Sequence, residues 1–223
     1  MKDFFIIGHR GACYYEPENT LRSFKKALQL KCKLIECDVR LTKDKRVIIM
    51  HDKTLDRTTN GHGPVSKYTL KELKKLNAGN GEKIPTLQEY INLLKNKAIM
   101  VIEFKKSKNI VKETLKLIKK NKIQNKVILL SFHARYLRKI KRIKKGFLSV
   151  RPLLAIKRAK LFEANYIGIY HRFLKKDFIN KCHKNNLKVF AYVRINENPS
   201  DKYIKKLIKL GLDGITLNKP ILQ

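Results

Sequence analysis

The chain has 223 residues, of which 43% are hydrophobic, and a formal net charge of +34. This length fits one domain with a large core, and no apolar run approaches the roughly 20 residues of a membrane-spanning helix. The apolar stretch at the N-terminus is too short for a signal peptide. The four cysteines lack CxxC spacing, so we expect reduced thiols and a cytoplasmic location.

The positive charge is spread along the chain and is not gathered in one motif. Lysines recur through segments predicted to be helical, as in 116–122 and 202–209. No aromatic platform, zinc-finger spacing or recognition helix stands out from this background. We therefore expect no specific nucleic-acid partner. So many cations should attract anionic substrates and weakly favour anionic membrane surfaces.

Short apolar runs predict nine strands. Only residues 40–46 separate the second strand from the third, and a parallel crossover needs about a dozen residues or more. The third strand should therefore return antiparallel, as a hairpin arm. The other eight strands, separated by helix-length segments, predict an α/β fold, a TIM-type (β/α)8 barrel. The nine predicted strands are 4–7, 34–39, 47–50, 99–104, 127–130, 147–150, 166–170, 189–193 and 214–217.

The turn of the hairpin decides which side chains face one another. If Asp44 and Lys45 form a two-residue turn, Asp38 lies directly opposite His51 on the face that also carries Glu36. A three-residue loop would shift this pairing by one. Lysine is unfavourable at the positive φ of a primed turn.

We expect residues 1–223 to form a single barrel domain. Residues 53–97 contain no barrel strand and are predicted to be a small insertion after the second strand, over the barrel mouth. Within it, Thr69 with Glu72, and Thr86 before Gln88-Glu89, predict the starts of two capped helices. This insertion should influence substrate choice more than chemistry.

The first strand ends abruptly in Gly8-His9-Arg10-Gly11. In proteins that alternate strands and helices, ligands bind in the loops that leave the carboxyl ends of the strands. His9 and Arg10 in such a loop can share one phosphate. Arg10 can contact the phosphate oxygens with a forked guanidinium.

Three carboxylates lie at the ends of otherwise apolar strands. Glu36 and Asp38 share a face of the second strand, and Glu103 lies in the fourth. An unpaired carboxylate in such a strand is costly, and a cation explains the three together. Oxygen ligands alone favour one divalent cation, Mg²⁺ or Ca²⁺, over Zn²⁺. Lys105 shares the face of Glu103 and can meet a phosphate oxygen.

In their order along the chain, these motifs resemble the glycerophosphodiester phosphodiesterase family. The resemblance implies a barrel enzyme in which His9 and His51 form the acid–base pair. Which histidine is the acid stays open, as does the choice between water and an internal glycerol hydroxyl as nucleophile. The matching segments are His9-Arg10-Gly11, Pro17-Glu18-Asn19-Thr20, 35–39, His51-Asp52, 102–105, 131–132 and 211–216.

Several other residues give weaker indications of a role in the site. We expect Glu18 to support the site, and His62, His133 and His183 to be structural; His171 could face the mouth but has no motif behind it. The family often has Trp where this chain has Tyr192. Residues 216–220 also depart from the common Thr-Asp before Pro.

The sequence thus predicts a metal-dependent phosphodiesterase that hydrolyses glycerophosphodiesters to glycerol 3-phosphate and an alcohol. One alternative is lysophospholipase D-type hydrolysis of lysophospholipids. Another is a non-catalytic protein that binds an anionic surface or nucleic acid. The head group, the physiological metal and the oligomeric state are left open.

Overall fold

The computed structural model describes residues 4–221, so both ends of the predicted 1–223 domain lie outside the described residues. Eight parallel strands pair in the order β1-β9-β8-β7-β6-β5-β4-β2, and β1 pairs with β2 to close the barrel. The predicted TIM-type (β/α)8 barrel is confirmed. The strands are β1 (Phe5–Gly8), β2 (Leu34–Leu41), β3 (Val47–Ile49), β4 (Ile99–Phe104), β5 (Val127–Ser131), β6 (Lys144–Ser149), β7 (Tyr166–Tyr170), β8 (Lys188–Tyr192) and β9 (Gly214–Leu217).

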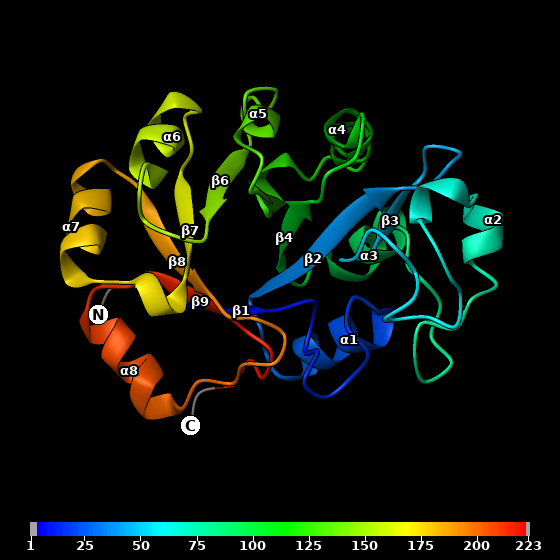
Figure 1. Ribbon diagram of the computed structural model, residues 1–223, viewed down its shortest axis with the longest axis horizontal. Coiled ribbons are helices and arrows are strands. Elements are labelled where there is room, and N and C mark those ends of the chain that lie inside the picture. The colour runs from blue at the N-terminus through cyan, green and yellow to red at the C-terminus, as the bar shows by residue number, and fades with distance from the viewer. Residues whose placement is uncertain (1–3, 222–223) are drawn as a thin grey trace.

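Helices surround the strands in a ring, and α2 lies outside this ring at the right of Figure 1. No helix among the described residues is both long and apolar enough to cross a membrane. Three 3₁₀ helices add short turns, η1 (Val65–Lys67), η2 (Gln124–Lys126) and η3 (His171–Phe173). The α-helices are α1 (Leu21–Gln29), α2 (Leu70–Leu73), α3 (Leu87–Leu94), α4 (Ile110–Lys120), α5 (Ala134–Leu137), α6 (Ala155–Leu161), α7 (Lys176–Lys184) and α8 (Asp201–Lys209).

Alternate residues of each strand pack into two different cores. In β4, Val101 packs inside the barrel with Ile7 and Ile128, whereas Met100 and Ile102 pack toward the helices. Because both faces of a parallel sheet are covered, its strands are apolar almost throughout. A polar side chain near the carboxyl end of such a strand is therefore exceptional.

The hairpin runs antiparallel as predicted, but its register differs from the two-residue turn. Val39 pairs with Ile49, and the Met50 N–H donates to the Asp38 carbonyl at 2.9 Å. Met50, not His51, therefore lies opposite Asp38, and that predicted pairing is wrong by one residue. The cause is a three-residue loop in which Lys45 takes φ +60° and Asp44 accepts hydrogen bonds within the turn and from the start of α2.

Residues 53–97 contain two kinds of structure. Both predicted helix starts are confirmed, because Thr69 with Glu72 and Thr86 with Glu89 form capping boxes. Helix α3 packs in the barrel ring, where the Tyr90 ring lies 4.7 Å from that of Phe24 on α1. Most of the remainder packs against β3 around a small separate core. Its role as an insertion over the mouth stays a prediction.

Replacing Lys45 with glycine should raise the free energy of unfolding by about 1 kcal/mol, because a side chain with Cβ is strained at positive φ. Urea denaturation of Lys45→Gly measures this. Lys43→Gly is the matched control, since Lys43 lies in the same loop without positive φ. Equal changes in both variants would contradict the left-handed turn.

Candidate active site

The loop after β1 is a tight backbone structure. Gly11 has φ +90°, and a Cβ there would lie 2.3 Å from the Ser23 Oγ. The Ser23 hydroxyl accepts from the Ala12 N–H at 2.9 Å and donates to the Arg10 carbonyl at 2.8 Å. These contacts fix the loop against α1. As a result the Arg10 N–H donates to Glu36 Oε2 at 2.8 Å.

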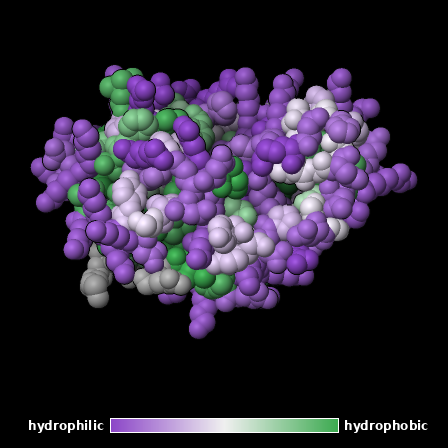
Figure 2. All heavy atoms as spheres, turned by 60° about the horizontal axis from the view of Figure 1, so that its bottom comes forward, coloured by the Kyte–Doolittle hydropathy of each residue, from purple (hydrophilic) through white to green (hydrophobic). Residues whose placement is uncertain are grey.

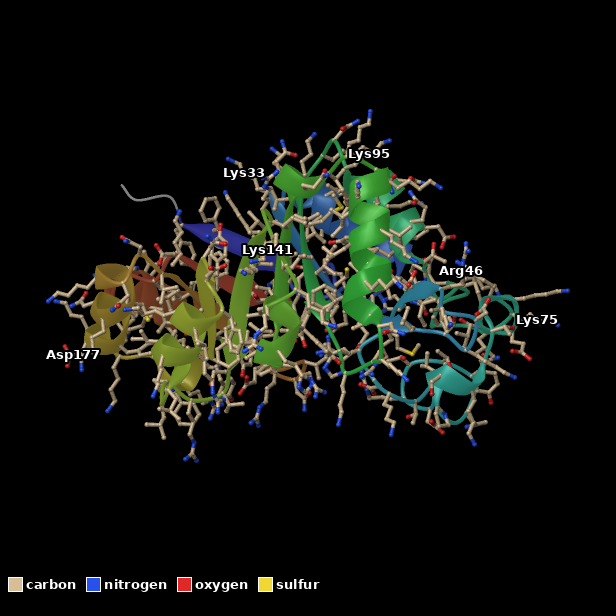
Figure 3. The ribbon with its side chains drawn as sticks, turned by 90° about the horizontal axis from the view of Figure 1, so that it is seen from above. Lys33, Arg46, Lys75, Lys95, Lys141 and Asp177 are labelled. Atoms are coloured by element: carbon tan, nitrogen blue, oxygen red, sulfur yellow. The ribbon has the colours of Figure 1, made fainter. Side chains whose placement is uncertain are left out.

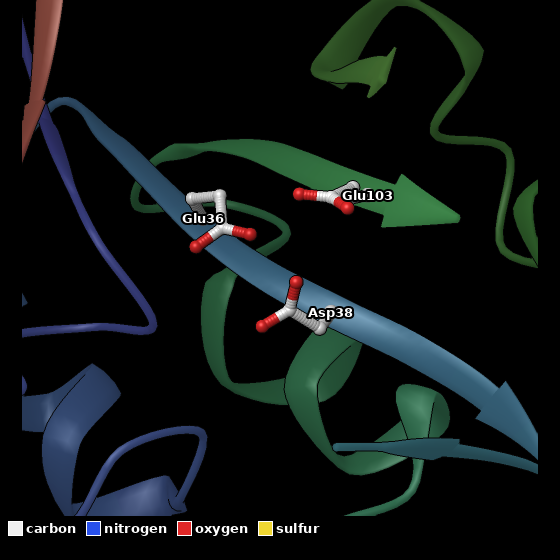
Figure 4. Close-up of side chains that lie close together, drawn as sticks. All are labelled: Glu36, Asp38 and Glu103. Atoms are coloured by element: carbon white, nitrogen blue, oxygen red, sulfur yellow. The ribbon is translucent and has the colours of Figure 1, made fainter. Parts of the chain in front are cut away.

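Three carboxylates converge at this end of the barrel. Glu36 and Asp38 lie two residues apart on β2, and the sheet register pairs Asp38 with Glu103 on β4. One oxygen from each lies within 4.8 Å of the others. Figure 4 shows the three carboxyl groups turned toward a common space. Because Glu36 and Asp38 are almost fully buried, their charges are poorly screened by water.

Cations compensate this cluster only in part. The Lys105 ammonium lies 2.9 Å from Asp38 Oδ1 and also bonds Glu103, and the Arg10 Nε lies 3.4 Å from Asp38 Oδ2. Burial alone would raise the pKa of Asp38, but Lys105 and Arg10 outweigh it and hold that pKa well below its usual range. Glu36 forms no ion pair within residues 4–221. Burial, then the charges of Asp38 and Glu103, raise the pKa of Glu36 well above its usual value.

His9 lies in the loop after β1, and its Nδ1 lies 2.6 Å from Asn218 Oδ1. The Asn218 amide nitrogen donates to three backbone carbonyls within 194–197, so its oxygen must face the imidazole and His9 donates from Nδ1. Burial, and then the charge of Arg10, lower the pKa of His9 to about 4. His9 is therefore neutral at pH 7, with Nε2 able to accept a proton.

His51 follows β3, and its Nδ1 lies 2.6 Å from Asp52 Oδ1. The Arg40 guanidinium donates from Nε to the His51 carbonyl at 3.0 Å, which fixes the backbone. Burial lowers the pKa of His51, while the bond to Asp52 opposes this shift. No Nε2 hydrogen bond forms for either His9 or His51 within the described residues, so both nitrogens are available to a substrate.

A chain of alternating charges joins the two sides of the site. The Arg10 Nη1 lies 2.6 Å from Glu18, whose other oxygen lies 2.7 Å from Arg57. Arg57 also pairs with Asp52 at 2.6 Å, and Asp52 holds His51. Glu18 thus supports two cations of the site at once. Charged groups arranged in this way orient one another with little freedom to rotate.

Seven residues were predicted from the sequence as site residues, and the structure places all seven at one end of the barrel. The sequence did not indicate the orienting roles of Asn218, Asn19, Arg40 and Arg57. Asn218 lies 209 residues from His9 along the chain, whereas Arg57 lies only 5 residues from Asp52 but belongs to no pattern that marks it. Asn19 donates to Asp38 Oδ2 at 2.9 Å. Asp52, which directly follows His51, and Glu18, which was expected to support the site, were the local signals of supporting groups. The seven central residues are His9, Arg10, Glu36, Asp38, His51, Glu103 and Lys105.

The other histidines differ in their surroundings. The His62 side chain is 87% exposed and the His183 Nε2 lies 2.7 Å from Asp213. His171 lies at the end of β7, where it contacts Glu197 and Tyr203. Only His171 among these three lies near the mouth, and its bonds hold the loop after β8.

The fold and the charged strand ends place this chain among the (β/α)8-barrel enzymes. The sequence matches the model of the Glycerophosphoryl diester phosphodiesterase family over residues 9–222, and the chain belongs to that family. It is therefore an enzyme of the phosphoric diester hydrolase class. The resemblance stated from the sequence motifs is confirmed, and a non-catalytic binding protein is not the class to which this chain belongs.

Named relatives extend the comparison. A glycerophosphodiester phosphodiesterase of Caldanaerobacter subterraneus is 35% identical over 232 residues, covering 96% of this chain and 94% of the relative. One from Bacillus subtilis is 30% identical, covering 96% and 83%. An Oleispira antarctica phosphodiesterase, solved with the product sn-glycerol-3-phosphate, is 27% identical, with a TM-score of 0.89 and coverage of 97% and 93%.

Asp52→Asn should lower the pKa of His51 in the metal-free protein, because the ring loses a charged acceptor that stabilises the imidazolium. Titration of the His51 ring protons by NMR measures the shift. Asp56→Asn is the matched control, because Asp56 lies 3.4 Å from the exposed His62. An unchanged or raised pKa of His51 in Asp52→Asn would refute the role given to this pair.

Proposed function

We propose that this enzyme hydrolyses glycerophosphodiesters to glycerol 3-phosphate and an alcohol with one bound divalent cation. The observation that carries the proposal is the buried carboxylate cluster of Glu36, Asp38 and Glu103, which shares the mouth with His9 and His51. The Oleispira antarctica enzyme, which was solved with sn-glycerol-3-phosphate, supports the substrate class. A deacylated diester such as glycerophosphocholine is the small-molecule substrate that we propose for this charged barrel mouth.

The donor set fits Mg²⁺ or Ca²⁺. Three carboxylates lie close together, and Glu36 forms no ion pair within the described residues, so its pKa is raised by burial and by the charges of Asp38 and Glu103. A hard divalent cation with oxygen ligands relieves this repulsion. When bound, such a cation supplies charge stabilisation for the phosphoryl oxygens. Glu36, Asp38 and Glu103 are the residues that would hold it.

Arg10 and Lys105 are proposed to bind the phosphate. The Arg10 Nε is buried and has no hydrogen-bond partner among residues 4–221, and such a donor is costly unless a ligand satisfies it. Lys105 lies beside two of the carboxylates. A phosphate at this place meets the guanidinium on one side and the ammonium on the other.

We propose different roles for the two histidines because their hydrogen-bond partners differ. His9 is held by a neutral amide and is neutral at pH 7, which suits a base that takes a proton on Nε2. His51 is held by the Asp52 carboxylate, which opposes the lowering of the His51 pKa by burial, and we propose His51 as the acid that protonates the departing oxygen. The proton can come to His9 from water or from the free glycerol hydroxyl. The second route forms a cyclic phosphate first.

Lysophospholipids remain the second candidate substrate. Within residues 53–97, none of the large hydrophobic side chains is exposed, so this segment offers no lipid groove and favours a deacylated diester. On the other side of the mouth, the rings of Phe132 and Tyr192 lie 5.7 Å apart and Tyr170 lies 5.9 Å from Tyr192. These rings could accept a single acyl chain.

We also propose that the chain forms one catalytic domain and that the enzyme is located in the cytoplasm.

His9→Ala and His51→Ala should each lower kcat for glycerophosphocholine by a factor of about 10² to 10⁴, the usual contribution of a general acid or base. Release of glycerol 3-phosphate, with Mg²⁺ or Ca²⁺ and then with chelator, is the measurement. His62→Ala is the matched control, because His62 is exposed. Full activity in His9→Ala or His51→Ala would remove the acid–base pair from the proposal.

Glu36→Gln should weaken divalent-cation binding without unfolding the protein, because a neutral amide relieves repulsion in the metal-free cluster but is a poorer ligand. Isothermal titration with Mg²⁺ and Ca²⁺ measures it, with the exposed Glu163→Gln as control. The raised pKa of Glu36 means that the cation competes with a proton. Affinity in the unmodified protein should therefore increase as pH rises; binding unaffected by Glu36→Gln would contradict the site.

A further inference from the structure

Exposed hydrophobic side chains gather at the catalytic end of the barrel. Among the described residues, nine large hydrophobic side chains are exposed, and two of these, Ile99 and Leu161, lie at the start of β4 and at the end of α6. The other seven lie in loops that leave the carboxyl ends of strands. These are Tyr14, Tyr15, Phe132, Val150, Leu153, Leu154 and Phe173. Figure 2 shows that hydrophobic atoms interrupt a mostly hydrophilic surface only in separate areas.

The loops after β5, β6 and β7 carry five of these side chains, which we call the lipid-facing surface: Phe132, Val150, Leu153, Leu154 and Phe173. The loops touch one another through rings. The Arg151 guanidinium lies 5.6 Å from the centre of the Phe173 ring, and the Phe173 ring lies 5.9 Å from Tyr170. Tyr170 and Tyr192 continue this row of rings toward the carboxylates. The exposed surface is therefore continuous with the catalytic mouth.

Leu153 and Leu154 have no structural reason to be leucine. Leu153 is 79% exposed and Leu154 is 52% exposed, so neither contributes much to a core. Leu154 also has φ +59° at the start of α6, where glycine or asparagine would be less strained. Two exposed leucines in a strained turn are better explained by contact with an apolar environment outside the protein.

The positive charge around this surface argues against a second copy of the chain or a nucleic acid as its binding partner. Residues 114–162 contain 16 Lys and Arg and no Asp or Glu. Side chains that end in nitrogen point outward along much of the outline of Figure 3, and Lys33 and Lys95, which lie before β2 and β4, are among them. A second copy of a chain with net charge +34 would be repelled. Nucleic acid would leave the leucines without a partner.

We propose that the lipid-facing surface docks this enzyme on anionic phospholipid membranes, with Leu153 and Leu154 entering the acyl region and the catalytic mouth toward the bilayer. An anionic membrane binds proteins that present apolar loop tips next to cationic side chains. The docking proposal deepens the proposed phosphodiesterase function. It rests on that function for one consequence, which is that the docked enzyme takes up its substrate where phospholipids are degraded. Docking itself requires no catalysis.

The test is co-sedimentation of the full chain with vesicles of phosphatidylcholine and phosphatidylglycerol in equal parts. The double variant Leu153→Ser, Leu154→Asn should lower the partition coefficient about tenfold or more, because two leucines lose their burial in lipid. Asparagine relieves the strain at 154, so the variant should fold at least as well. Leu161→Ser is the matched control, since Leu161 is 66% exposed at the end of α6. It should bind as the unmodified protein does.

Three results would overturn the docking proposal. They are unchanged vesicle binding by the double variant, an equal loss in Leu161→Ser, and a dimer in solution that the double variant dissociates in light scattering. Hydrolysis of glycerophosphocholine without vesicles, measured on the same samples, should be equal in all of them. Absence of hydrolysis in the unmodified protein would refute the proposed function, while the vesicle result would still decide docking.

Discussion

The repulsion among three buried carboxylates is the constraint on which the rest of the site depends. Glu36, Asp38 and Glu103 bring three carboxyl groups together, and ionisation of all three would place three negative charges side by side where Glu36 and Asp38 are almost fully buried. Lys105 and Arg10 supply two positive charges beside Asp38, so the cluster retains an excess of negative charge. A barrel whose interior is otherwise apolar gains nothing in stability from this arrangement. The proposed divalent cation would relieve this repulsion.

The sheet register produces this cluster, and the supporting groups make it usable. Because β2 lies beside β4, Asp38 and Glu103 are neighbours by backbone pairing alone. The β1 loop then places the Arg10 N–H on Glu36. The alternating charges from Arg10 to Asp52 hold the partner of His51, whereas Asn218 holds His9. Rigid strands therefore position the three carboxylates, whereas loops anchored by hydrogen bonds position the two histidines.

Sequence patterns predicted those parts of the structure that depend on local chemistry. Apolar runs predicted the strands, and the short 40–46 connection predicted the antiparallel arm. Carboxylates in apolar strands predicted residues that the structure brings together, Glu36, Asp38 and Glu103. The prediction of the hairpin register failed because the turn holds Lys45 in a strained conformation that the hydrogen bonds of Asp44 stabilise. Asn218 was noticed only as a departure, because its bond to His9 spans most of the chain.

Charge and hydrophobicity carry different information in this protein. Lysine and arginine recur along the whole chain, so their charge attracts anions without selecting an orientation. Exposed leucines and aromatic rings lie mainly at one end, and these can select one. At a membrane, the long-range attraction would bring the enzyme near in any orientation, whereas the short-range apolar contacts would retain only the one in which the mouth faces the lipid. Orientation at a surface thus follows from a few loop residues, although the charge of the whole chain drives the encounter.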